Sequence, residues 1–259
     1  MAETAPDSIY SERYVAFIDI LGFSEIVRKS VGKPEQATEL VRILERISTR
    51  TGSLAYDGLF GEDFRAQSFS DCIVLSEIAT DGGLEHLLQV VTDLSLDLLA
   101  NNILTRGGVA KGKLHHSDRI VFGPALVEAY RLETSIAEYP RIVVDRAIHL
   151  DFKRIKQTGR VSWIDARHHG QLRHGDDGPV FVDIFASLRD LSGSPPERLT
   201  VIGATCREAI QRHLNEAIYD PRIYRKLQWL AGYWNSVVMG QEIPKRMGMV
   251  VFPIADDLR

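Results

Sequence analysis

The chain has 259 residues, of which 44% are hydrophobic and 25% charged, so it has enough apolar side chains for a sizeable core. Its net charge of −4 argues against a protein that binds long nucleic acid, because such a protein would usually be basic. Cys72 and Cys206 are the only cysteines, which excludes a disulfide scaffold and a four-cysteine zinc site and fits a reducing compartment.

Apolar runs and helical spacing alternate through the first 145 residues. After a polar tail over residues 1–12, an apolar run over 14–19 meets Asp19 and predicts a strand that ends in a turn at Gly22. Pro34 opens a predicted helix with an apolar stripe. The other elements predicted here are strands over 64–69 and 72–76, a helix over 84–98, strands over 105–113 and 119–122, a helix over 124–137 and a strand over 142–144.

The pattern is less regular after residue 145. The elements predicted there are a helix over 145–156, strands over 161–164 and 180–185, a linker over 192–197, and helices over 197–218 and 221–237. We therefore expect one catalytic-type domain over 13–190 and a helical C-terminal extension over 191–259. No apolar run approaches the ~18 residues of a membrane span. The first residues lack the pattern of a secretory signal, so we expect a soluble cytoplasmic protein.

The predicted order through residue 115 is strand, helix, strand, strand, helix, strand, which is typical of the ferredoxin-like α+β fold, an antiparallel sheet flanked by helices. In that topology the first and third strands are antiparallel neighbours. Asp19 ends the first strand and Asp71 precedes the third, so their carboxylates are predicted to lie side by side. Adjacent carboxylates repel unless one is protonated or a cation lies between them, and their hard oxygens suit Mg²⁺ or Mn²⁺. The alternative is that both are turn residues.

Four segments resemble motifs of the class III nucleotidyl cyclases, in the family's order and at similar spacing. They are FIDILGF (17–23), FSD (69–71), RGGVAKG (106–112) and GPALVEAYRLE (123–133). The AYRLE stretch and KLQWLAGYWN (226–235) are most similar to the bacterial Pycsar anti-phage pyrimidine cyclases. The resemblance implies the ferredoxin-like (palm) fold of the cyclase catalytic domain.

The resemblance also implies a metal site. Asp19, Asp71 and the backbone carbonyl of Ile20 would bind two divalent metal ions, Mn²⁺ or Mg²⁺. These ions would hold the triphosphate and polarise the ribose 3′-hydroxyl, whose oxygen attacks the α-phosphorus as pyrophosphate leaves.

Arg131 corresponds to the family's transition-state arginine, a role that suits a guanidinium because it is always charged and binds phosphate oxygens. The alternative is an ion pair with Glu128 or Glu133. Val127 replaces the family's asparagine, which orients the ribose. Sites of this family form between two catalytic domains. The single domain here therefore implies a head-to-tail homodimer.

Five further residues are candidates for binding the substrate. Phe17, Gly22 and Phe23 belong to the first metal segment, and the backbone around Gly22 is expected to approach the phosphates. Gln67 occupies the base-reading position where adenylyl cyclases carry a lysine, and its amide can pair with a pyrimidine. Phe69 could stack on the base, although an aromatic residue in a strand is more often part of the core.

The predicted function is a metal-dependent pyrimidine nucleotide cyclase that converts UTP to 3′,5′-cyclic UMP and pyrophosphate. In the family this product is an anti-phage messenger read by a separate effector. The alternatives are a cytidylate cyclase that makes cyclic CMP and a non-catalytic nucleotide sensor on the same fold.

Lys111 and Lys113 either reach the phosphates or form a solvated face, and the paired histidines lack the spacing of a zinc site.

Overall fold

The apolar run at the start of the chain forms β1 (Ser11–Ile20), the strand on which the sheet is built. The computed structural model describes residues 9–38, 41–42, 45, 63–158, 171–188, 197–239, 248 and 250. The strands of the main sheet lie in the order β2-β3-β1-β4-β6-β8-β7, and β5 pairs with β4 off this path. Their bounds are β2 Arg65–Phe69, β3 Cys72–Ile78, β4 Thr105–His116, β5 Val121–Phe122, β6 Ile142–Val144, β7 Leu172–His174 and β8 Val180–Val182.

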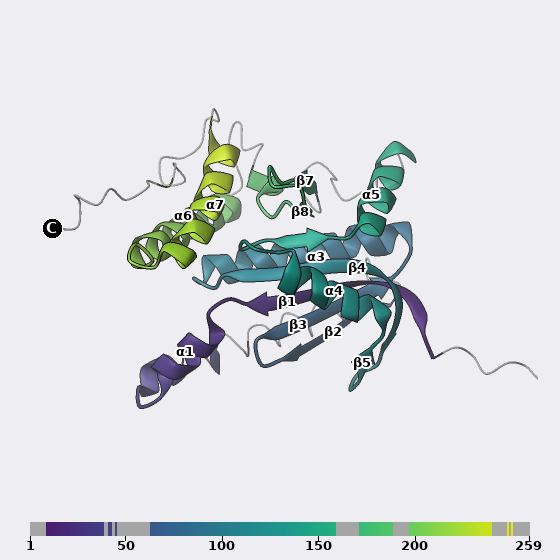
Figure 1. Cartoon of the computed structure of the whole chain (residues 1–259), viewed down its shortest axis with the longest axis horizontal. Coiled ribbons are helices and arrows are strands. Elements are labelled where there is room, and N and C mark those ends of the chain that lie inside the picture. The colour runs from purple at the N-terminus through teal and green to yellow at the C-terminus, as the bar shows by residue number, and fades with distance from the viewer. Residues whose placement is uncertain are drawn as a thin grey trace, which may run out of the picture.

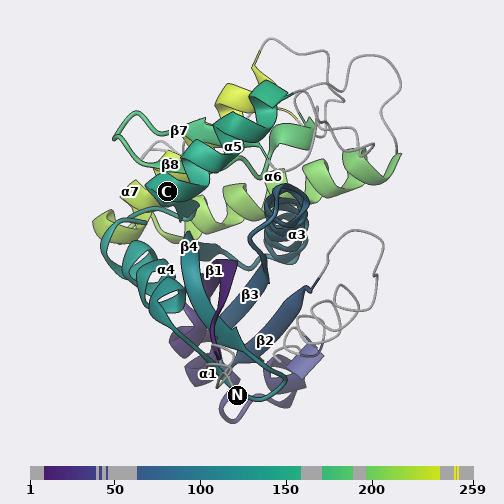
Figure 2. The same ribbon diagram turned by 90° about the vertical axis from the view of Figure 1, so that its right-hand side faces the viewer.

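Helices cover both faces of this sheet, with α3 and α4 on opposite sides of β1 and β4 (Figures 1 and 2). Because both faces are covered, β1 is buried along most of its length instead of alternating with exposed positions. The helices are α1 Phe23–Ser30, α3 Asp81–Ala100, α4 Pro124–Ser135, α5 Arg146–Thr158, α6 Glu197–Glu216 and α7 Pro221–Val238, with a 3₁₀ turn at Ala186–Leu188.

The ferredoxin-like α+β architecture predicted from the element order is confirmed for β1 to β4. β1 pairs antiparallel with both β3 and β4, and β2 pairs antiparallel with β3. Beyond these four strands the sheet becomes mixed, because β4 and β6 are parallel. Helix α4 connects them as a crossover, which returns the chain to the same end of the sheet before β6 begins.

Two elements were missed by the sequence analysis. α1 follows Gly22 directly. It has an apolar side made by Phe23, Ile26 and Val27, but it is only eight residues long and buries none of them fully, so it was not recognised as a helix. β7 has only three residues, and it is held by pairing with β8. β1 begins at Ser11, inside the segment expected to be a tail. The predicted strand over 161–164 lies outside the described residues.

The C-terminal helices pack onto the sheet domain instead of standing apart from it. α6 lies along α3, where the Cys206 thiol is 3.7 Å from the Leu96 carbonyl oxygen and His213 Nε2 is 3.1 Å from the Asn102 carbonyl oxygen. One continuous hydrophobic core includes Trp234 from α7. The division at residue 190 stays a prediction. In the part of the chain that is described, no helix is both long and apolar enough to cross a membrane.

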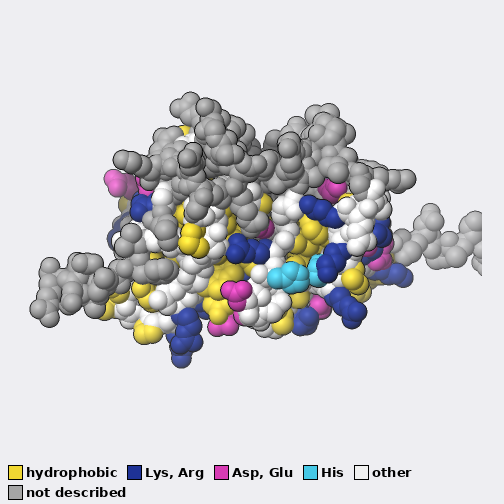
Figure 3. All heavy atoms as spheres, turned by 90° about the horizontal axis from the view of Figure 1, so that it is seen from above, with side chains coloured by type: hydrophobic (Ala, Val, Ile, Leu, Met, Phe, Trp, Pro, Cys, Tyr) yellow, Lys and Arg dark blue, Asp and Glu magenta, His cyan; other side chains and the backbone are white. Residues whose placement is uncertain are grey.

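Charge is distributed unevenly over the surface. α5 carries several basic residues, and a view from above shows Lys and Arg side chains gathered beside histidines toward one end of that face (Figure 3). Two of the basic residues near α5 are paired with acids: Arg154 with Asp81 at 2.7 Å and Lys111 with Asp151 at 2.7 Å. These pairs tie α5 to α3 and β4, so part of this positive charge is structural.

Helix α4 lies unusually close to β4 because β4 carries glycine at the contact. A Cβ on Gly108 would lie 2.3 Å from the Ala129 carbonyl oxygen and 2.6 Å from Leu132 Cβ. Neither neighbour is the end of a flexible side chain, so the helix would have to move. The spacing of α4 from the sheet, and hence the position of every residue on α4, depends on this glycine.

We expect Gly108→Ala to lower the free energy of unfolding by about 1–3 kcal/mol, because the added methyl group overpacks the α4–β4 contact. Gly82→Ala is the matched control: Gly82 has nothing within 4 Å of the Cβ position, and alanine there should be neutral or stabilising by up to about 1 kcal/mol. Urea denaturation of both variants gives the comparison. Equal stability of the two would contradict the close approach of α4.

Candidate active site

Asp19 and Asp71 lie together at the end of β1, as their places in the topology predicted. Asp19 faces Cys72 in the β1–β3 register, and the backbone N–H of Ile20 donates to the Asp71 carbonyl oxygen at 3.0 Å. Ligand atoms of Asp19, Asp71 and Cys72 all lie within 4.8 Å of one another. Two carboxylates and a thiol thus converge on one point from two neighbouring strands.

Tight turns hold the two aspartates in place. Asp71 is the second residue of a two-residue loop between β2 and β3, whose first residue, Ser70, has a φ of 56°. On the other side, Leu21 N–H donates to the Leu104 carbonyl oxygen at 2.9 Å and fixes the chain just after β1. Gly22 then adopts a φ of 76°, which favours glycine, and serves as the N-cap of α1.

The electrostatic environment raises the pKa of Asp19 to about 6. Burial is the main cause, and repulsion from Glu133 and Asp71 adds to it, while Arg106 opposes it. Close to neutral pH, ionised Asp19 therefore lowers the stability of the folded chain. A cation bound between the carboxylates would offset this loss of stability. The oxygen donors of Asp19 and Asp71 therefore fit a hard divalent metal ion.

Arg106 and Glu133 form a buried ion pair beside the aspartates that sequence reasoning did not identify as part of this cluster. Arg106 faces Asp19 in the β1–β4 register, and its Nε donates to Glu133 Oε1 at 2.7 Å. Glu133 is only 3% exposed. The signal was present in the sequence, because Glu133 shares the buried face of α4 with Ala125 and Ala129, where an apolar residue would be expected.

Cys72 is the third residue of the cluster that sequence reasoning missed. Its Sγ lies 3.8 Å from Asp71 Oδ1, and burial together with the nearby acids raises the pKa of the thiol to about 11. The side chain therefore stays a neutral thiol at physiological pH. It lines the site without adding a third negative charge to the two carboxylates.

Arg131 does not join this cluster within one chain. Its side chain is half exposed on α4, and its guanidinium donates to both carboxylate oxygens of Glu128, at 2.7 and 2.8 Å. This is one of the two ion pairs that the sequence left open as an alternative to a catalytic role. Glu133, the other possible partner, is bound to Arg106 instead.

Phe17, Gly22 and Phe23, the candidates from the first metal segment, differ in how far they are buried. Phe17 is half-buried on the same face of β1 as Asp19, with its ring 5.4 Å from that of Tyr130 on α4. Gly22 is exposed, and Phe23 packs partly against the core.

Gln67 and Phe69 lie on β2. The Nε2 of Gln67 is 3.4 Å from the Arg119 carbonyl oxygen, and its Oε1 is buried with no hydrogen-bond partner among the described residues. Phe69 is 81% exposed, so it is not a core residue, the commoner role that the sequence left open for it. Phe69 is thus open to a ligand or a partner, whereas the Gln67 amide is partly engaged within the chain.

Lys111 takes neither of its two predicted roles. Its ammonium is bound to Asp151 at 2.7 Å and lies over the Tyr14 ring, 5.5 Å from the centroid. Lys113 is exposed. His116 is bound to Ser76 Oγ at 2.8 Å, and His115 to the Ile9 carbonyl oxygen at 3.0 Å. The second histidine pair lies outside the described residues.

No protein-family model and no curated protein matches the chain. Among solved structures, the monomeric guanylyl cyclase domain of the RhoGC fusion protein from the aquatic fungus Blastocladiella emersonii is similar, with 16% identity and a TM-score of 0.47 over 67% of this chain and 95% of that one. A class III adenylyl cyclase-like ATP-binding protein from Pseudomonas aeruginosa has 12% identity and a TM-score of 0.41, over 55% and 35%. The adenylate/guanylate cyclase/hydrolase from Silicibacter pomeroyi has 18% identity and a TM-score of 0.39, over 66% and 94%.

The raised pKa of Asp19 gives a prediction about stability without metal. The folded chain holds this proton up to about pH 6, whereas an unperturbed aspartate releases it near 3.8, so stability should fall as pH rises across this range. In EDTA at pH 8, Asp19→Asn should therefore be more stable than wild type by about 1 kcal/mol, a value reduced for the partial exposure of the side chain. At pH 4 the difference should vanish.

The measurement is urea denaturation at the two pH values. Glu138→Gln is the control, because it removes an exposed acid outside the cluster. A destabilised Asp19→Asn at pH 8 would show that ionised Asp19 is favoured in the folded chain, contrary to this expectation.

Proposed function

We propose that this chain is a metal-dependent class III nucleotidyl cyclase, which closes the ribose phosphate of a nucleoside triphosphate into a 3′,5′-cyclic ring and releases pyrophosphate. The observation that carries the proposal is the convergence of Asp19 and Asp71, residues far apart in sequence, at one end of the sheet. The four motif segments of the sequence support it, because both aspartates fall within them.

Asp19 and Asp71, with the carbonyl of Ile20, would hold two divalent ions, Mn²⁺ or Mg²⁺. When bound, such ions supply positive charge to the triphosphate and lower the pKa of the ribose hydroxyl. The protein's own part is to keep the carboxylates together against their repulsion and to pair the neighbouring Glu133 with Arg106. Positioning and charge account for most of the catalysis in phosphoryl transfer.

The start of α1 provides the phosphate contacts. The backbone N–H groups of Phe23 and Ser24 have no hydrogen-bond acceptor within the described ranges, whereas those of Glu25 and Ile26 donate to the Gly22 carbonyl oxygen at 3.0 Å. Free N–H groups at a helix N-terminus attract anions. The exposed Gly22 lets a triphosphate approach this backbone directly.

Arg131 would act on the site of a second copy of the chain in a head-to-tail homodimer. In one chain it points to solvent with Glu128, and the same helix exposes the apolar side chains of Val127 (69%) and Tyr130 (52%). An exposed apolar strip beside an arginine suits a protein interface, where a guanidinium can exchange Glu128 for substrate oxygens. Because the partner supplies the arginine, each site is complete only in the dimer.

The base that we propose is a pyrimidine, with UTP as substrate and cyclic UMP as product. Gln67 leaves a buried Oε1 without a partner among the residues described, and Nε2 of the same amide is only weakly engaged at 3.4 Å. A base that offers a donor beside an acceptor satisfies both atoms. Uracil and cytosine both do so, as do the purines, so the choice of a pyrimidine rests on Gln67 standing where adenylyl cyclases carry a purine-reading lysine. CTP is the second candidate. Phe69, exposed at the end of β2, would stack on the base.

The proposed role follows the Pycsar resemblance of the sequence. The cyclic nucleotide would be a messenger in defence against phage, read by a separate effector protein. A non-catalytic nucleotide sensor is the rival function, and Val127 favours it, since no amide is present there to orient the ribose. The sensor would bind a nucleoside triphosphate with Mn²⁺ and release no pyrophosphate.

The first test incubates the purified full chain with each of the four nucleoside triphosphates and Mn²⁺, and separates the products by chromatography. We expect cyclic UMP, and at least a 100-fold loss of turnover in Asp19→Ala and Asp71→Ala, an order-of-magnitude figure for removing a metal ligand. Conversion of ATP or GTP alone would contradict the base assignment. Full activity in either aspartate variant would contradict the metal site.

The second test concerns the homodimer. Asp19→Ala and Arg131→Ala should each be inactive as pure homodimers. Mixing them should restore about a quarter of wild-type activity, because half of randomly exchanged dimers are mixed and each mixed dimer has one intact site. Mixing Asp19→Ala with Asp71→Ala is the control and should restore nothing, because both changes fall in the same half of the site. Absence of recovery in the first mixture would contradict action of Arg131 across the interface.

A further inference from the structure

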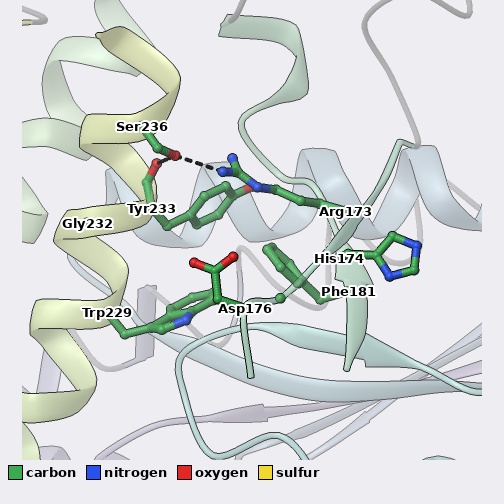
Figure 4. A pocket seen from close by; sticks show the side chains of 9 residues that line it. Arg173, His174, Asp176, Phe181, Trp229, Gly232, Tyr233 and Ser236 are labelled. Carbon is green, nitrogen blue, oxygen red and sulfur yellow. Dashed lines mark hydrogen bonds between the residues drawn. The ribbon is translucent and has the colours of Figure 1, made fainter. Parts of the chain in front are cut away.

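A cavity of about 300 Å³ lies between the β7–β8 hairpin and α7. It is at the β7 edge of the sheet, separated from the aspartate pair by β4, β6 and β8. Figure 4 shows Trp229 and Tyr233 entering it from α7, and Arg173, Asp176 and Phe181 from the hairpin and the adjoining strand. Its volume is at the lower end of the range for small-molecule sites.

The aromatic walls of this cavity are fixed by their surroundings. The Phe181 ring lies edge-on to both Trp229 and Tyr233, with centroids 5.4 and 5.3 Å away. Trp229 stacks on Tyr139 at 5.1 Å, and the Tyr233 hydroxyl donates to the buried carboxylate of Asp183. Rings held in this way form a preformed apolar surface for a ligand, which costs little ordering on binding.

The charges that line the cavity lack partners of opposite sign. Arg173 donates to Ser236 Oγ at 3.0 Å and lies over the Tyr233 ring, but it contacts no carboxylate within the described segments. Asp176 has no hydrogen-bond or ion-pair partner there either. In the close-up its carboxylate points into the space between the rings, whereas His174 points away from it (Figure 4).

The charged residues next to the cavity, unlike those that line it, are paired with each other. Arg141, directly behind the cavity, is almost fully buried and is paired with Asp177, Nη1 to Oδ1 at 2.8 Å. The hairpin therefore neutralises one arginine with one aspartate and leaves the adjacent aspartate, Asp176, unpaired. The result is one free positive charge and one free negative charge on the same aromatic cavity.

We propose that this cavity binds a small zwitterion with an aromatic body, the chemistry of the free aromatic amino acids. Asp176 takes the ammonium group, Arg173 takes the carboxylate in a charge-assisted hydrogen bond, and the ring packs against Phe181 and Trp229. The charges of the lining sum to zero, which matches a zwitterion. A nucleoside monophosphate, with two negative charges, would leave its charge uncompensated beside Asp176. This proposal does not depend on the cyclase activity.

Isothermal titration of the full chain tests the proposal, with L-tryptophan, L-tyrosine and L-phenylalanine as probes. At least one should bind with a stoichiometry of one per chain. For the best binder, analogues that lack the carboxylate or the amine (for tryptophan, tryptamine and 3-indolepropionate) should bind at least about tenfold more weakly, the usual cost of one hydrogen bond to a charged group. Uridine 5′-monophosphate is titrated as the rival ligand.

Two variants test whether Arg173 and Asp176 bind the charged groups of the ligand. Arg173→Gln and Asp176→Asn should each weaken the best probe at least about tenfold. The matched controls Arg222→Gln and Glu138→Gln alter exposed charges elsewhere and should bind as wild type. The proposal is overturned if none of the three amino acids binds, if neither cavity variant changes binding, or if only the nucleotide binds and depends on Arg173.

Discussion

The mutual repulsion of acids at the end of β1 is the constraint on which the rest of this structure depends. Asp19, Asp71 and Glu133 approach one another in a partly buried place, where each ionised carboxylate raises the cost of the next. Among the described residues, Arg106 is the cation that opposes the raised pKa of Asp19, and it is bound to Glu133. The protein thus folds around a site with unbalanced negative charge. Such an arrangement is costly for stability and useful only if positive charge arrives from outside.

Helix α4 links this charge to the proposed dimer. Its buried face carries Glu133, which restrains Arg106, and its exposed face carries Arg131. Both faces are positioned by one contact, the packing of the helix against Gly108. A shift of α4 would therefore move Glu133, which lies in the site of the same chain, and Arg131, which is proposed to act in the site of a second chain. This explains why a glycine, which weakens a strand by itself, is useful in β4.

The central part of the fold and the meeting of Asp19 with Asp71 were predictable from the sequence, because both follow from the order of strands and helices. Element order specifies which strand ends share an edge, even when boundaries are off by several residues. The parts that escaped prediction are short elements, in which few residues repeat the pattern of a helix or strand: α1 has eight residues and β7 has three.

The site was predicted only in part, for a related reason. Its ligands follow an apolar strand or occupy a turn, where an acid is conspicuous. Arg106 and Glu133 come from a strand and a helix whose pairing depends on the packing of α4, which the sequence does not encode locally. The proposed role of Arg131 likewise depends on a second copy of the chain, which the order of elements in one chain does not reveal. The proposed roles of the site residues therefore stay predictions.

The position of β1 has a consequence for the way this chain comes into being. Of the described strands β1 is the first to be synthesised, yet its partners are β3 and β4, and its pairing with β4 joins Ser11 to Leu114. Until about residue 116 has been made, the apolar segment from Tyr14 to Ile20 has only part of its final neighbours. Long-range pairing of this kind slows folding and exposes a strand that other chains could capture. The charged pair of Glu12 and Arg13 just before it, and Asp19 within it, place charge along the segment during that interval. The carboxylate proposed to bind metal in the folded chain therefore also places a charge that opposes association of the nascent chain.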